Sequence, residues 1–165
     1  MNDGRIRVPV QGLTSVSNQL SHVLKHELAH SFIQQKTLGR CPGWLQEGLA
    51  QWIDGRRSAK DAQPLIAAYE REGSAQLRRL EGSWVELSVQ DARSAYAWSL
   101  ASVESIIANS GMWGIERLLE NLATQSSAED ALRGALHTNY ADLERETVRY
   151  LRRIPPSAPE VKPAR

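Results

Sequence analysis

The sequence predicts a mainly helical fold of the α+β class, in which one short strand precedes a run of helices. Alternation of apolar and polar residues is confined to the start of the chain, and the rest has the apolar spacing of helices. Glycine, proline and serine pairs interrupt the helical pattern. At 165 residues, with 41% hydrophobic and 24% charged residues, the chain is expected to form one domain.

The strand is expected at residues 5–10, RIRVPV, where Pro9 favours an edge position. A first helix is predicted from residue 14 or 15 to 37, ended by Gly39 and by the pair Pro42–Gly43. Residues 74–90 are given no structure. The domain is expected to cover residues 1–153, and the tail 154–165, with four prolines, is expected to be disordered. The remaining helices are predicted at 44–54, 61–72, 91–109, 112–124, 127–137 and 140–153.

Charge and composition exclude several classes of function. The net charge of +1 gives no reason to expect nucleic acid, and the arginine doublets are expected to be solvated. Cys41 is the only cysteine, so the chain has neither an internal disulfide nor a CxxC metal motif. No apolar run approaches the roughly 18–20 residues needed to cross a bilayer, so no membrane insertion is expected. The doublets are Arg56–Arg57, Arg78–Arg79 and Arg152–Arg153.

Residues 24–32, LKHELAHSF, put His26, Glu27 and His30 within the first predicted helix. At about 100° per residue, histidines four positions apart lie about 40° from each other, so both can bind one metal ion. Zinc is the expected ion, because it accepts neutral imidazole nitrogen and tolerates an open coordination position. In the HExxH pattern the histidines hold zinc and the glutamate accepts a proton from the attacking water.

Glu27 is predicted to lie within a buried apolar stripe of this helix. A carboxylate in such a stripe is costly unless a nearby cation offsets its charge, which favours a metal site. The alternative is a surface helix whose histidines and glutamate make incidental contacts. The stripe is expected to consist of Val16, Leu20, Val23, Leu24 and Leu28.

A third ligand is expected in the second helix, within PGWLQEGLAQW at residues 42–52. Catalytic zinc commonly has three protein ligands and a water. Sixteen residues (31–46) lie between His30 and Glu47, enough to turn and bring a second helix back beside the first. Gln51 and Asp54 share the face of Glu47, and either could orient a ligand histidine. The alternative is that Glu47 is an ordinary solvent-facing residue.

HELAH followed by PGWLQEGLAQW resembles the gluzincin zinc metallopeptidases, and within them the bacterial peptidase MA-like domains, which carry a WLxEGLA third-ligand helix. The later segments AYAWSLASVESIIANSGMWGIERLLENLA and AEDALRGALHTNYADLERETVRYL resemble the helices that follow in that family. The similarity therefore covers most of residues 5–151. The first two motifs are specific, and the later helices support them.

The resemblance implies a zincin-like fold and a zinc-dependent peptidase acting on peptide or protein substrates. Carried over to this chain, it makes His26, His30 and Glu47 the ligands of one Zn²⁺ ion and Glu27 the general base. Tyr96 matches a tyrosine that the family tends to place near the metal, where its hydroxyl would stabilise an oxyanion. The alternative for Tyr96 is a packing role.

The chain departs from the family in having a shorter loop before Glu47 and almost no sheet beside the HExxH helix. The missing strands are expected in an upstream region of a longer parent protein. The resemblance favours the bacterial cell envelope or secretion, although no targeting segment is recognised. Two other functions stay open. One is a zinc-bound, non-catalytic scaffold or interaction module of a larger protein, and the other is a metal-free helical bundle with a chance motif.

Overall fold

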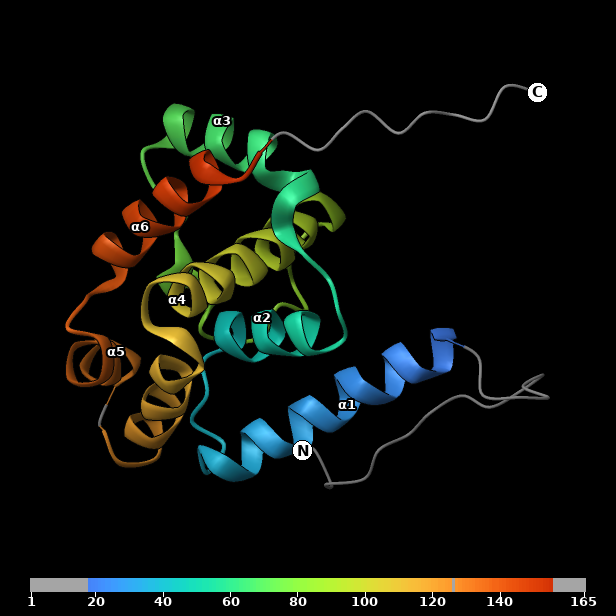
Figure 1. Cartoon of the computed structure of the whole chain (residues 1–165), viewed down its shortest axis with the longest axis vertical. Coiled ribbons are helices and arrows are strands. Elements are labelled where there is room, and N and C mark those ends of the chain that lie inside the picture. Colours follow the sequence, from blue (N-terminus) through green and yellow to red (C-terminus); the bar gives the residue numbers. More distant parts are fainter. Residues whose placement is uncertain (1–17, 126, 156–165) are drawn as a thin grey trace.

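The computed structural model describes residues 18–125 and 127–155, and in that part of the chain it contains helices and no strand (Figure 1). The helical part of the predicted fold class is therefore confirmed. The expected strand at 5–10 and most of the tail 154–165 lie outside the described residues. The elements are α1 (Asn18–Lys36), α2 (Gly43–Ile53), the 3-10 helix η1 (Ser58–Asp61), α3 (Ala62–Glu72), the 3-10 helix η2 (Leu77–Leu80), α4 (Val89–Thr124), α5 (Ala128–Leu136) and α6 (Tyr140–Arg153).

Local signals in the sequence set most helix ends. The side chains of Ser88 and Ser127 each accept a hydrogen bond of 3.1 Å from the backbone N–H three residues later, and so begin α4 and α5. Gly73 ends α3 in the left-handed region, with φ 73°. The two helices predicted at 91–109 and 112–124 are the two parts of α4, which bends between them at Gly111, where φ is 65° and ψ is −175°.

α2 lies at the centre, with α4 on one side and α1 on the other, while α3, α5 and α6 surround α4 (Figure 1). Gly48 permits the close crossing of α2 and α4. A Cβ at this position would lie only 2.4 Å from the carbonyl oxygen of Ser99. The hydrophobic core takes residues from all six α-helices, with Trp44 and Leu45 of α2 fully buried. None of the described helices has both the length and the apolar character needed to span a bilayer.

Two buried carboxylates hold segments for which the sequence predicts no helix or strand, one at Ser58 and one at Ala75. Glu104 of α4 accepts hydrogen bonds from the backbone N–H of Ser58 and from the hydroxyl of Tyr150, both at 3.2 Å. Glu144 of α6 accepts one from the backbone N–H of Ala75 at 3.0 Å, in the stretch before η2. Each carboxylate thus compensates its own burial with donors from the loop beside it.

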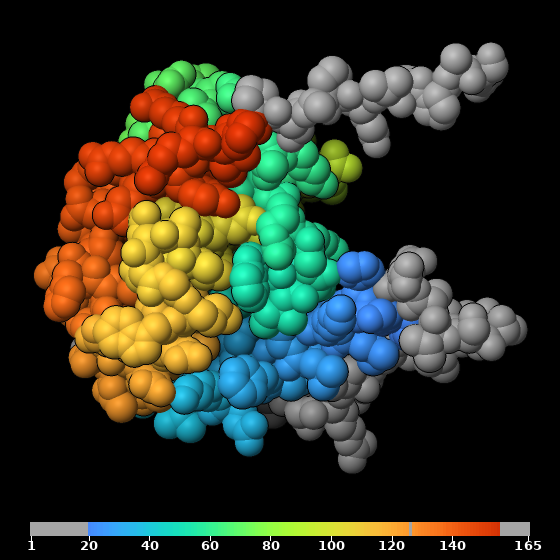
Figure 2. Space-filling model, viewed as in Figure 1, coloured from blue at the N-terminus to red at the C-terminus, as the bar shows by residue number. Residues whose placement is uncertain are grey.

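The predicted buried stripe of α1 is wrong for two of its five residues, Val23 and Leu28; Leu20 and Leu24 are half-buried, and Val16 lies outside the described residues. Val23 and Leu28 are 38% and 54% exposed, while Ala29 and Ile33 are buried. The reason is that Ala29 and Ile33 are the residues through which α1 joins the hydrophobic core, in a helix whose main neighbour is α2. Figure 2 shows α1 as a blue ridge at the edge of the molecule. Glu27 is accordingly half-buried, and burial in an apolar stripe does not explain its presence.

Candidate metal centre

The turn between α1 and α2 sets how the two helices face each other. Leu38 and Gly39 both adopt the left-handed conformation, with φ 53° and 75°. Gly43 then starts α2, and its N–H donates to the carbonyl of Glu81 at 2.8 Å. A Cβ on Gly43 would lie 2.8 Å from the carbonyl oxygen of Gly82, so this close approach requires glycine.

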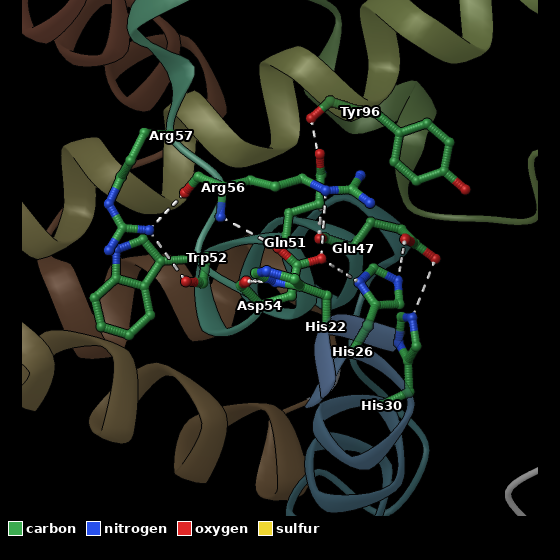
Figure 3. A network of polar contacts seen from close by, with 10 residues as sticks. All are labelled: His22, His26, His30, Glu47, Gln51, Trp52, Asp54, Arg56, Arg57 and Tyr96. Carbon is green, nitrogen blue, oxygen red and sulfur yellow. Dashed lines mark hydrogen bonds and ion pairs between the residues drawn. The ribbon is translucent and has the colours of Figure 1, made fainter. Parts of the chain in front are cut away.

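This turn brings together the side chains of His26, His30 and Glu47, the three ligands predicted from the sequence (Figure 3). One ligand atom from each residue lies within 4.8 Å of the other two. His26 Nε2 is 3.7 Å from one carboxylate oxygen of Glu47, and His30 Nε2 is 3.7 Å from the other. The two imidazole rings stand edge to face, with centroids 4.7 Å apart.

These distances fit the ligands of one ion better than they fit a hydrogen-bonded cluster. Hydrogen bonds between nitrogen and oxygen are typically about 2.7–3.2 Å long, and 3.7 Å is beyond that range. Two atoms that each lie about 2.0–2.1 Å from a tetrahedral zinc are roughly 3.3 Å apart. Each of the two imidazole–carboxylate distances exceeds this value by a few tenths of an ångström. Two imidazoles and a carboxylate are also a donor set that zinc accepts.

Asp54, at the end of α2, orients the first histidine. Its carboxylate oxygen Oδ2 lies 3.2 Å from His26 Nδ1, and the side chain is only 2% exposed. This contact places the ring proton of a neutral His26 on Nδ1 and leaves the lone pair of Nε2 directed at the cluster. The backbone carbonyl of Asp54 also contacts Nδ1 of His22, one turn earlier on α1. Of the two residues expected to orient a ligand, Asp54 does so.

Gln51 has a different role from the one considered for it. Its Nε2 donates to the backbone carbonyl of Tyr96 at 3.0 Å and to that of Glu47 at 3.2 Å. It therefore ties α2 to α4 and fixes the backbone of Glu47, the predicted third ligand; among the described residues its hydrogen bonds go to backbone carbonyls.

Burial acts in opposite ways on two of the predicted ligands. It favours the neutral imidazole that metal binding needs in His30, and it disfavours the charged carboxylate that metal binding needs in Glu47. Burial, and then the neighbouring charge of His26, lower the pKa of His30, so that its imidazole stays neutral. Burial raises the pKa of Glu47, and the charge of Glu27 adds to the rise, while His26 opposes it. A cation at this position would stabilise the Glu47 carboxylate.

Two buried atoms of the cluster have no hydrogen-bond partner in the described part of the chain, namely His30 Nδ1 and Glu47 Oε2. Buried polar atoms in proteins are nearly always paired, so each such exception needs an explanation. For Glu47 Oε2, which lies 3.7 Å from His26 Nε2, a metal ion would supply one.

Glu27 lies beside the cluster on the wall of an open cleft of about 480 Å³. Its charge adds to the burial-driven rise in the pKa of Glu47 and partly opposes the burial-driven fall in the pKa of His30, which is consistent with its position next to the predicted ligands. The cleft gives solvent and a small ligand access to this side of the site. Its lining consists of His22, Val23, His26, Glu27, Asp54 and Arg56.

Tyr96 projects from α4 towards the cluster (Figure 3). Its ring packs edge to face against Trp84, with centroids 5.0 Å apart, and the residue is 38% exposed. Burial, and then the charge of Glu47, raise the pKa of Tyr96, so its hydroxyl stays protonated at neutral pH. Tyr96 therefore packs against Trp84 and also lies near the predicted metal ligands, so its position is compatible with both roles considered for it.

Arg56 makes a contact that was not expected from the sequence. Arg56 belongs to a doublet expected to be solvated, yet its Nε lies 3.3 Å from the buried carboxylate of Asp54. The sequence contains one indication of this position, because Arg56 follows Asp54 by two residues and Asp54 is expected on the same helix face as Glu47. Cys41 lies outside the cluster of ligand atoms, and burial raises the pKa of its thiol well above the usual range.

No family model matches the chain, and neither does any curated protein or solved structure.

Proposed function

We propose that this chain is a zinc-dependent peptidase of the gluzincin type. The observation that carries the proposal is the convergence of His26, His30 and Glu47, with histidine nitrogens 3.7 Å from carboxylate oxygens. The motifs HELAH and WLQEGLA, which resemble those of gluzincins, support it from the sequence. The Asp54–His26 contact supports it further, because ligand histidines usually donate their second ring nitrogen to a carboxylate or carbonyl.

A zinc ion held by His26, His30 and Glu47 would supply Lewis-acid activation of a water and of the scissile carbonyl. Glu27 then acts as general base: one carboxylate oxygen takes the proton from the attacking water and delivers it to the nitrogen of the leaving amine. The protonated hydroxyl of Tyr96 donates a hydrogen bond to the carbonyl oxygen as negative charge develops there. Asp54 keeps His26 in the required tautomer.

Zinc stoichiometry and peptide hydrolysis test this proposal together. We expect about one zinc per wild-type chain and none in Glu47→Ala. With a diverse peptide library, we expect cleavage that a chelator stops. Glu27→Gln should keep its zinc and lose activity by about 10²–10⁴-fold, because only the proton transfer is removed.

Glu116→Gln is the matched control, since Glu116 is an exposed glutamate of α4 away from the cluster. It should retain both zinc and activity. Wild-type protein without zinc would contradict the metal site and favour a metal-free bundle. Full activity of Glu27→Gln would contradict the mechanism alone.

A second function, a zinc-bound module without catalysis, is favoured by the exposed apolar face of α1. Leu28 and Phe32, four positions apart on one side of this helix, are 54% and 61% exposed. Such a face suits contact with another segment or protein. Zinc binding without chelator-sensitive cleavage of any library peptide would favour this alternative.

A further inference from the structure

Arg56 stands at the edge of the cleft, in the turn that follows α2, and it is anchored there. Its backbone N–H donates to the carbonyl of Gln51 at 2.9 Å and lies 3.2 Å from Asp54 Oδ1. Its Nε is 3.3 Å from Asp54 Oδ2. Because Asp54 also contacts His26, one buried carboxylate connects Arg56 to a predicted metal ligand.

The outer end of the Arg56 guanidinium is available. Its side chain is 61% exposed, and in the described part of the chain no hydrogen bond or ion pair engages its two terminal nitrogens. Burial raises the pKa values of both Glu47 and Tyr96, and the charge of Arg56 partly opposes this rise, so Arg56 lies within electrostatic reach of the cluster. Figure 3 shows the guanidinium extending past Asp54 on the side of Tyr96.

The cleft beside Arg56 has the size of a small-ligand site. Its volume of about 480 Å³ falls within the range of roughly 300–1,000 Å³ found for such sites. Arg56 is the only lysine or arginine among its described lining residues, and Glu27 lines the same cleft. A ligand anion held by Arg56 would therefore lie next to the proposed general base.

The neighbouring Arg57 is used differently. Its Nη1 donates to the backbone carbonyl of Trp52 at 3.2 Å, and its guanidinium lies 5.4 Å from the centre of the Trp52 indole ring. Arg57 is thus engaged with the surface of α2, and it does not line the cleft. The two adjacent arginines provide a test residue and its internal control.

We propose that Arg56 is a specificity residue that binds a carboxylate of the substrate. This proposal rests on the proposed peptidase function and adds a substrate class to it, peptides that carry a free carboxylate close to the scissile bond. A guanidinium presents two parallel N–H donors that match the two oxygens of a carboxylate, and the Asp54 contact at Nε fixes its orientation. The carboxylate is either the C-terminal one or that of an acidic side chain.

Zinc-binding probes with and without a carboxylate test the proposal by calorimetry. Mercaptoacetyl-alanine and mercaptoacetyl-dialanine are compared with their C-terminal amides, and the amide of mercaptoacetyl-aspartate with that of mercaptoacetyl-asparagine. For zinc-loaded wild type we expect at least one carboxylate probe to bind about tenfold or more tightly than its neutral partner, as for a charge-assisted hydrogen bond. Arg56→Gln should abolish this preference, and Arg57→Gln should keep it.

The pattern among the probes identifies the source of the carboxylate. A preference confined to the free C-terminal acids supports a C-terminal carboxylate, and one shown by the aspartate probe supports an acidic side chain. Equal binding of acids and neutral partners by the wild type would overturn the proposal. So would an Arg56→Gln variant that keeps the preference, even if its zinc affinity or Tm falls, because Arg56 would then serve only to hold Asp54.

The failure of the proposed function has a separate signature. If no probe binds the wild type in a zinc-dependent manner, the metal site itself is refuted, and the role of Arg56 with it. Zinc-dependent binding without any preference for carboxylates refutes Arg56 alone.

Discussion

Replacing Gly48 by alanine is expected to push α2 away from α4 and to disturb the site through the fold. The new Cβ would lie 2.4 Å from the carbonyl oxygen of Ser99 and 2.7 Å from Val103 Cγ2. Comfortable contacts between such atoms begin at about 3.4 Å, so the helices have to separate by roughly 1 Å. The Ser99 carbonyl belongs to the backbone of α4, and it cannot rotate away.

The size of the effect follows from two opposing contributions. Alanine in a helix interior is favoured over glycine by about 1 kcal/mol. Overpacking a core costs about 1–3 kcal/mol, and the upper end applies here because the obstacle is backbone. We therefore expect Gly48→Ala to lower the free energy of unfolding by about 2 kcal/mol, equivalent to a fall in Tm of about 4–8 °C for a domain of this size. Glu47 immediately precedes Gly48, so zinc affinity should fall about tenfold as well.

Thermal unfolding of the zinc-free protein, followed by circular dichroism, measures the first effect, and competition with a chromophoric chelator measures the second. Gly82→Ala is the control, because a Cβ at Gly82 has no atom within 4 Å and the residue needs no positive φ. It should change the Tm by no more than about 1–2 °C, within the usual range for surface substitutions. A Gly48→Ala variant at least as stable as the wild type would refute the tight α2–α4 crossing.

Asp54→Ala should weaken zinc binding by about 10–100-fold in the same chelator competition, because His26 loses the carboxylate that orients it; an unchanged affinity would show that this contact is dispensable. Glu47→Gln should abolish zinc binding yet stabilise the zinc-free protein by about 1 kcal/mol at pH 7. Burial raises the pKa of Glu47 above its ordinary 4.5, so the wild type loses stability as the pH rises through this raised pKa, and the advantage of the variant should vanish below pH 4.5. A gain that grows towards low pH in urea titrations would contradict this sign. Glu104→Gln should lower the free energy of unfolding by about 2–3 kcal/mol, because its charged hydrogen bonds to Ser58 and Tyr150 are lost, and urea unfolding measures it; a wild-type midpoint would exclude a structural role for this carboxylate.

The parts of the site that the sequence predicts are those fixed by local geometry. His26 and His30 lie on one side of α1 because the helix itself sets their angle, whatever packs around it. Glu47 reaches them because Pro42–Gly43 ends the connection and starts α2 at a fixed place. Polar caps and glycines likewise predict the ends of the later helices.

The parts that the sequence does not predict depend on contacts between distant elements. Periodicity finds the apolar residues of α1, but it does not determine which of them face α2, and the structure buries Ala29 and Ile33 in place of Val23 and Leu28. The apolar periodicity of the helices gives no information about Arg56, a charged residue that lies after the end of α2. Its place beside the cluster follows from the way the chain leaves α2 and from the buried Asp54 carboxylate, both of which are tertiary features.

The buried carboxylates of this chain make the strongest physical case that Glu47 binds a cation. Glu104 and Glu144 receive hydrogen bonds from backbone N–H and hydroxyl groups, so the fold supplies donors where a carboxylate is structural. Glu47 Oε2 is buried with no hydrogen bond among the described residues, although His26 Nε2 lies 3.7 Å away. An unpaired buried carboxylate oxygen costs about 1–3 kcal/mol or more. If Glu47 served packing alone, nothing would offset this free-energy cost, whereas an ion bound by Glu47 would offset it.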